Sequence, residues 1–108
     1  MTNSEYVGYL EKFMLQLSQQ EYYDAHESLE AIWFPKRFED DDEIRLIKGF
    51  INASVSFELI KKGRLDASDK VWKNYLKYKD LINKIDSIYT SYYKTIIIQI
   101  ESIKASYL

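Results

Sequence analysis

One stretch of the sequence decides the fold: EIRLIKGFINASVSFELIKK, residues 43–62. At about 100° of rotation per residue, as in an α-helix, its apolar side chains do not gather on a single side. They form two faces, Ile44, Ile51 and Val55 on one and Leu46, Phe50 and Phe57 on the other. A helix that is apolar on most sides is usually buried on most sides. The stretch therefore predicts the central helix of a helical bundle.

Helical periodicity also precedes this stretch. A first helix should begin with Ser4 as its N-cap, since a serine side chain can accept a hydrogen bond from the free backbone amides there. A second helix should run over residues 21–34 and end at Pro35, because the residue before a proline avoids helical backbone angles. Asp41 or Asp42 should then cap the central helix, whose N-terminal dipole favours carboxylates.

Two further helices follow. Gly63 is a typical C-terminal stop for the central helix, and Asp66 should cap the fourth. The last helix carries Ile96-Ile97-Ile98, which alone would favour a strand, but the chain offers no second strand to pair with it. We predict an all-α protein, a compact bundle of about five helices with a central buried third helix, in a single domain over residues 1–108.

Composition limits the classes of partner and compartment. The net charge of −2 gives no electrostatic reason to bind nucleic acid. No run approaches the roughly 20 apolar residues that cross a bilayer, so we expect no membrane segment. The N-terminus lacks the basic and apolar regions of a signal peptide. Cysteine is absent, which excludes disulfides and thiolate sites and suits a cytoplasmic location.

The residues that carry chemistry lie in the second predicted helix, in HESLEAIW, residues 26–33. His26 is the only histidine of the chain. His26 and Glu30 are one helical turn apart and can pair with each other. Both lie at the border of the apolar stripe, beside Trp33, while Glu27 lies further toward water. A polar group at such a border needs a partner, because a buried unpaired one costs roughly 1–3 kcal/mol.

Three interpretations of this stretch remain open. In the first, His26 or Glu30 hydrogen-bonds to Lys48 or Asn52 on the third helix, Gly49 lets the helices approach closely, and Trp33 covers the network. In the second, His26, Glu27 and Glu30 act as acid and base or bind a divalent metal. Glu58 or Asn52 of the third helix would complete the site, and the corresponding metal set is His26, Glu30 and Glu58. The zinc-protease pattern does not apply, because the chain lacks its second histidine. In the third, Trp33 borders a pocket for a small molecule.

The motif from His26 to Trp33, together with KGFINA over residues 48–53 and Lys62-Gly63, resembles a bacterial family of unknown function, the domain-of-unknown-function family 309. The resemblance covers about residues 20–76. It implies a compact all-helical cytoplasmic domain with no established activity. The family more often has glutamine at the position of Asn52 and leucine at that of Phe50. The matching residues are His26, Glu27, Glu30, Trp33, Gly49 and, approximately, Asn52.

Two functional classes follow from these patterns. The first is a binding or assembly module, with no cofactor and as a homodimer, because Tyr93, Ile97 and Ile98 widen the apolar stripe of the last helix beyond one face. The second is an enzyme that uses His26, Glu27 and Glu30, with a metal or a small molecule. The sequence names no catalytic residue with a defined reaction.

Overall fold

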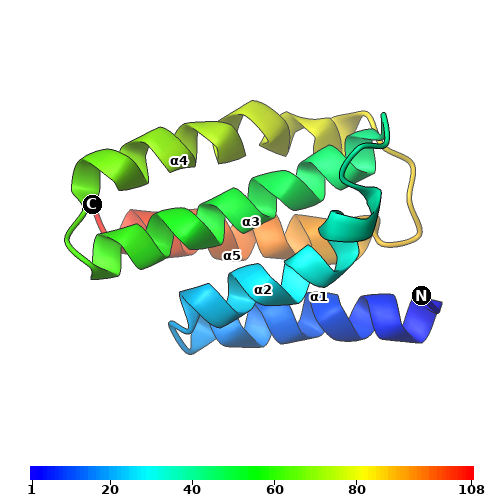
Figure 1. Cartoon of the computed structure of the whole chain (residues 1–108), viewed down its shortest axis with the longest axis horizontal. Helices are drawn as coiled ribbons and strands as arrows, with labels where there is room; N and C mark the ends of the chain where they lie inside the picture. The colour runs from blue at the N-terminus through cyan, green and yellow to red at the C-terminus, as the bar shows by residue number, and fades with distance from the viewer.

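The computed structural model describes all 108 residues and contains five α-helices, two short 3-10 helices and no strand (Figure 1). The α-helices are α1 (Asn3–Ser18), α2 (Tyr22–Trp33), α3 (Asp42–Lys61), α4 (Leu65–Lys79) and α5 (Thr90–Ser106). The 3-10 helices are η1 (Phe34–Lys36), which continues α2 through Pro35, and η2 (Asp80–Asn83), which follows α4. The predicted all-α bundle is confirmed. No helix combines the length and the apolar character needed to cross a membrane.

Helix α3 lies at the centre of the bundle. Figure 1 shows α4 along one side of it, the α1–α2 hairpin along the other, and α5 behind it. Successive helices run in alternating directions, as short connections require. Seven of the eighteen buried apolar residues belong to α3, so this helix supplies the largest part of the core. They are Ile44, Leu46, Ile47, Phe50, Ile51, Ala53 and Phe57.

The helix boundaries follow the local chemistry, with two corrections. Thr2, rather than Ser4, caps α1: its hydroxyl accepts from the backbone amide of Glu5 at 3.1 Å, and the Glu5 carboxylate accepts from the Thr2 amide. Asp41 caps α3 as expected. Gly63 follows the last turn of α3. Its φ of +74° lies in the left-handed region, which glycine adopts without strain. Helix α4 begins before Asp66, which therefore lies in its first turn.

Helices α3 and α4 pack along a strip of small residues. A Cβ atom placed on Gly49 would lie 2.9 Å from the Cβ atom of Tyr78 on α4, so only glycine permits this approach. Further along, the buried Ser56 and Ser68 hydroxyls are 2.8 Å apart, and each also donates to the backbone carbonyl of the other residue. The glycine that we expected to bring α2 close to α3 thus brings α4 close instead.

Helix α5 is attached to the other helices by tyrosine hydroxyls. The buried Tyr93 donates to the Glu43 carboxylate on α3 and lies 2.5 Å from the Tyr6 hydroxyl on α1. From α4, Tyr75 donates to Glu101 at 2.6 Å. These hydrogen bonds connect α5 to α1, α3 and α4.

Candidate functional site

The one histidine forms the pair that its spacing predicts. His26 Nε2 lies 2.5 Å from Glu30 Oε1 across one turn of α2. The two side chains are 21% and 41% exposed, so the pair lies at the border of the core. The Tyr23 ring lies edge-on to the imidazole at 5.7 Å. This arrangement holds the imidazole in place but provides no third polar group.

The expected hydrogen bond from this pair to α3 is absent, and this prediction is wrong. Asn52 instead donates to the backbone carbonyl of Lys48 at 2.7 Å and accepts from Asn74 on α4 at 3.3 Å. Asn52 therefore lies on the α4 side of the central helix, and its amide is satisfied there. The predicted polar network divides into a His26–Glu30 pair on α2 and an Asn52–Asn74 bridge between α3 and α4.

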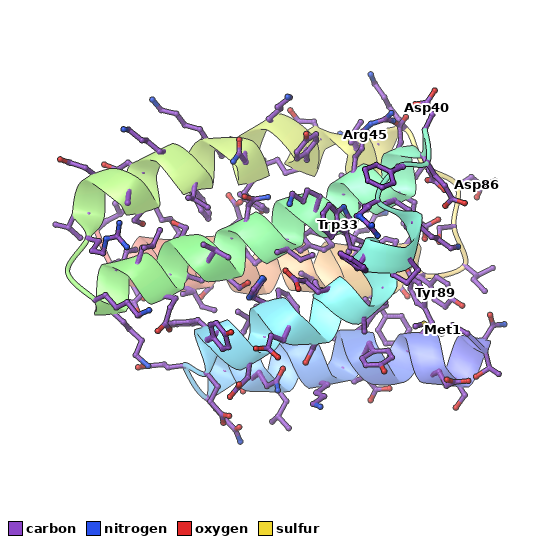
Figure 2. The ribbon with its side chains drawn as sticks, viewed as in Figure 1. Met1, Trp33, Asp40, Arg45, Asp86 and Tyr89 are labelled. Carbon is purple, nitrogen blue, oxygen red and sulfur yellow. The ribbon has the colours of Figure 1, made fainter.

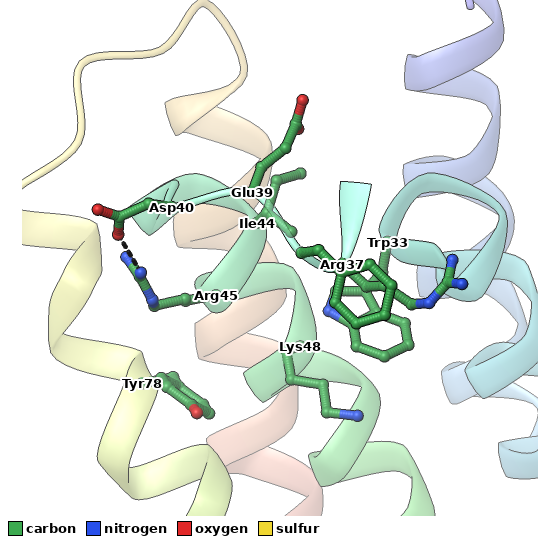
Figure 3. A pocket seen from close by; sticks show the side chains of 9 residues that line it. Trp33, Arg37, Glu39, Asp40, Ile44, Arg45, Lys48 and Tyr78 are labelled. Atoms are coloured by element: carbon green, nitrogen blue, oxygen red, sulfur yellow. Dashed lines mark hydrogen bonds and ion pairs between the residues drawn. The ribbon is translucent and has the colours of Figure 1, made fainter. Parts of the chain in front are cut away.

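The polar contact between α2 and α3 is made by Lys48 and Trp33 instead. The Lys48 ammonium lies 4.0 Å from the centroid of the Trp33 ring, which is a cation–π contact. Figure 3 shows both side chains at the edge of a cavity, with Tyr78 of α4 on the opposite side. The cavity has a volume of about 380 Å³. It lies where the α2–α3 connection meets α3 and α4.

Most residues around this cavity carry a charge or an aromatic ring. Sequence reasoning named Trp33 and Lys48 and missed the rest, because the connection between α2 and α3 has no periodicity to indicate which side chains converge. The lining consists of Trp33, Arg37, Phe38, Glu39, Asp40, Ile44, Arg45, Lys48 and Tyr78.

Arg37 organises the aromatic rim of the cavity. Its guanidinium carbon lies 3.6 Å from the centroid of the Phe34 ring and 4.5 Å from that of Phe38. Its Nη1 also donates to the Phe34 carbonyl at 2.5 Å. The Phe38 side chain is 89% exposed, which is unusual for a phenylalanine. We call the set Trp33, Phe34, Arg37, Phe38 and Lys48 the α2–α3 surface.

The cations of this region differ in their partners. Arg45 bonds to Asp40 and to Asp42, the latter at 2.8 Å, and its hydrogen bond and positive charge lower the pKa of the Asp40 carboxyl. Figures 2 and 3 show Asp40 and Arg45 together at the end of the bundle that also contains Trp33. Arg37 and Lys48, in contrast, form no ion pair with a carboxylate. Their charges remain available to a ligand.

The other residues with predicted chemistry lie apart from this cavity. His26 and Glu30 line none of the five principal hollows of the surface. Glu27 borders a separate shallow hollow beside α1. Glu58 pairs with Lys62 at 3.8 Å, and no group of three or more His, Asp or Glu side chains is placed to hold a metal ion. The structure thus does not bring His26, Glu30 and Glu58 together as a set.

Comparison with known proteins adds the family. The model of the family described as "Domain of unknown function (DUF309)" matches residues 10–76. The chain belongs to this family. The DUF309 match begins about ten residues earlier than the sequence motifs indicated, within α1, and ends in α4, so α5 lies outside it. No curated protein and no solved structure matches the chain significantly. DUF309 membership therefore identifies a family and assigns no activity.

Proposed function

We propose that the protein is a binding module that takes an acidic segment of a partner protein on the α2–α3 surface. The observation that carries this proposal is Phe38, an aromatic side chain that is almost wholly exposed beside two cations without carboxylate partners. Aromatic residues and arginine are the side chains enriched at the centres of protein interfaces. An exposed cluster of this kind marks a place where a partner packs.

The charge pattern favours an acidic partner. Lys36, Arg37 and Lys48 lie on or next to the α2–α3 surface and take part in no ion pair. Glu39 is the one carboxylate of the cavity lining without a basic partner, since Asp40 is neutralised by Arg45. A carboxylate of the partner would gain charge-assisted hydrogen bonds here, and an apolar side chain next to it would contact Trp33 and Phe38.

The position of the histidine favours binding over catalysis. Acid–base chemistry requires the titrating group within hydrogen-bond reach of a bound substrate. The His26–Glu30 pair lies outside every principal hollow, whereas the α2–α3 surface combines a cavity with unpaired charges. The residues of the family motif thus contribute in two ways: His26 and Glu30 pair within α2, and Trp33 and Lys48 take part in binding.

The test is selection of random peptides on the immobilised protein. We expect the recovered peptides to combine Asp or Glu with an aromatic or aliphatic residue. In calorimetric titrations, Phe38→Ala and Lys48→Met should each weaken their binding by tenfold or more, because truncation of an interface anchor costs on the order of 2 kcal/mol. Added salt should weaken binding as well, since it screens the charges.

Lys73→Met is the matched control, because Lys73 is an exposed lysine of α4 that lines no principal hollow and forms no ion pair. Its affinity for the peptides should equal that of the unmodified protein. Recovery of basic peptides, or equal binding by Phe38→Ala, Lys48→Met and the control, would contradict the proposal. Binding of small carboxylates alone, without peptides, would reassign the cavity to a small-molecule ligand.

A further inference from the structure

A second recess lies far from the α2–α3 surface, along the line where α5 passes α1. It has a volume of about 850 Å³ and is lined by twelve residues. The apolar ones are Met14, Leu17, Tyr22, Ile98, Ile103 and Tyr107, and the remaining six are Ser, Thr and Gln. We call this recess the α1–α5 groove.

The α1–α5 groove contains no charged side chain. Asp, Glu, Lys and Arg make up 30% of the chain, and each of the other four principal hollows includes at least three of them. The exposed face of α5 continues the pattern, since Lys94 is its only charged residue. A surface without charged side chains can be covered by another surface without leaving a charge buried and unpaired.

Two features of the groove indicate that a partner covers it: an exposed apolar side chain and a buried acceptor without a donor. The Ile98 side chain is 71% exposed although it lies at the midpoint of α5. Gln99 donates its amide to the Met14 carbonyl at 2.7 Å, but its Oε1 is buried and accepts no hydrogen bond. An unsatisfied buried acceptor costs roughly 1–3 kcal/mol, so a donor brought by a partner would be favourable there.

We propose that a second copy of the chain covers the α1–α5 groove, with the two α5 helices antiparallel and the two Ile98 side chains in contact at the two-fold axis. A two-fold interface of this kind places every residue near its axis against its own counterpart. Any charge there would face a like charge, which is destabilising. A surface free of charge is therefore suited to its own copy, whereas the charged hollows elsewhere are not.

Ile98 determines where the axis lies. Because it is the midpoint of α5, full overlap of two antiparallel α5 helices brings the two Ile98 side chains together. Serine and threonine residues flank it along the exposed face, at positions 91, 95 and 102, and their small size allows the helices to approach.

The first experiment measures mass in solution by sedimentation velocity. We expect the unmodified chain to have the mass of a dimer and Ile98→Glu to lose half of that mass, because two carboxylates would meet at the axis. Ile88→Glu is the matched control: Ile88 is 75% exposed, lies between η2 and α5, and lines none of the principal hollows. It should remain dimeric. A monomeric unmodified chain, or a dimeric Ile98→Glu, would overturn the proposal.

A second variant makes the result independent of any folding defect. The chain contains no cysteine, so a single introduced thiol can react only with a second copy. Ile98→Cys should form a disulfide-linked dimer in air, since two residues at a two-fold axis meet the short Cα separation that a disulfide needs. Ile88→Cys should remain unlinked. Equal cross-linking of the two variants would show that residue 98 does not face its counterpart.

Discussion

The His26 imidazole and the Glu30 carboxylate are 21% and 41% exposed, and water at this exposure screens the attraction between them. We expect a double-mutant cycle with His26→Gln and Glu30→Gln to give a coupling energy below about 1 kcal/mol. Urea denaturation of the four proteins would measure it. A coupling of several kcal/mol would show that the pair has a buried partner that the structure lacks.

Asn52 shows how far a helical pattern determines the direction and the hydrogen-bond partner of a side chain. The sequence identified it as an unexpected polar residue in a buried helix, which is correct. Its direction was also available, because Asn52 shares a face of α3 with Gly49 and Ser56, and that face packs on α4. The prediction failed because α2 precedes α3 in the chain and was taken as its polar partner. Nearness in sequence does not decide between two neighbouring helices.

The residues of the α2–α3 surface differ in how predictable they were. Trp33 and Lys48 lie in helices, where periodicity places them. Arg37 and Phe38 lie in the connection after η1, where no repeat relates sequence to direction. Ser28 of α2 is buried as well, and it donates to Gln16 of α1 at 2.7 Å. A serine can be buried at low cost when a neighbouring helix supplies the acceptor.

The seam between α3 and α4 depends on the absence of one methyl group. In Gly49→Ala the new Cβ would lie 2.9 Å from Tyr78 Cβ, and this atom is fixed to the α4 backbone, so the helix itself must move. Overpacking costs roughly 1–3 kcal/mol. The higher helix propensity of alanine offsets about 1 kcal/mol of this overpacking cost. We therefore expect a lower free energy of unfolding for Gly49→Ala, measured by urea denaturation.

Gly8→Ala is the control, and it should change stability in the opposite direction. Gly8 lies in α1 with nothing within 4 Å of the position of its Cβ. Alanine there should raise the free energy of unfolding by about 0.5–1 kcal/mol, through helix propensity alone. If both variants were stabilised, α3 and α4 would have room to separate, and the close approach at Gly49 would not be required.

The elements themselves were predicted well because each carries its own signals. The two-faced apolar pattern of residues 43–62 identified the central helix, and Asp41 and Gly63 marked its ends. The end of α4 was not predicted. No glycine or proline separates α4 from α5. The α-helix changes directly into the 3-10 helix η2, and no residue type in the sequence indicates where this change occurs.

At the scale of the whole molecule, the tyrosine hydroxyls make stability depend on alkaline pH. Burial raises the pKa of Tyr6, Tyr22, Tyr75 and Tyr93 above the ordinary value of 10.0. Above about pH 10 the unfolded chain therefore releases protons that the folded chain retains. The contribution of these tyrosines to the free energy of unfolding should be constant below this pH and fall as pH rises beyond it.

Denaturation midpoints across an alkaline pH series would measure this dependence. Tyr75→Phe removes one of the four hydroxyls together with its bond to Glu101, so it should be less stable at neutral pH and show a shallower alkaline decline. An unchanged midpoint throughout the range in which exposed tyrosines ionise would contradict the assignment of these hydroxyls as buried and protonated.

The position of α5 after the other four helices has a consequence for biosynthesis. The ring of Phe50 packs on Tyr93 and that of Phe57 on Tyr107, so these core residues are covered by a segment that is translated after the first four helices. On the ribosome the first four helices are complete before α5 is made, and the nascent chain exposes aromatic surface until α5 has been synthesised and has packed. Such exposure is a condition under which chains aggregate or require chaperones.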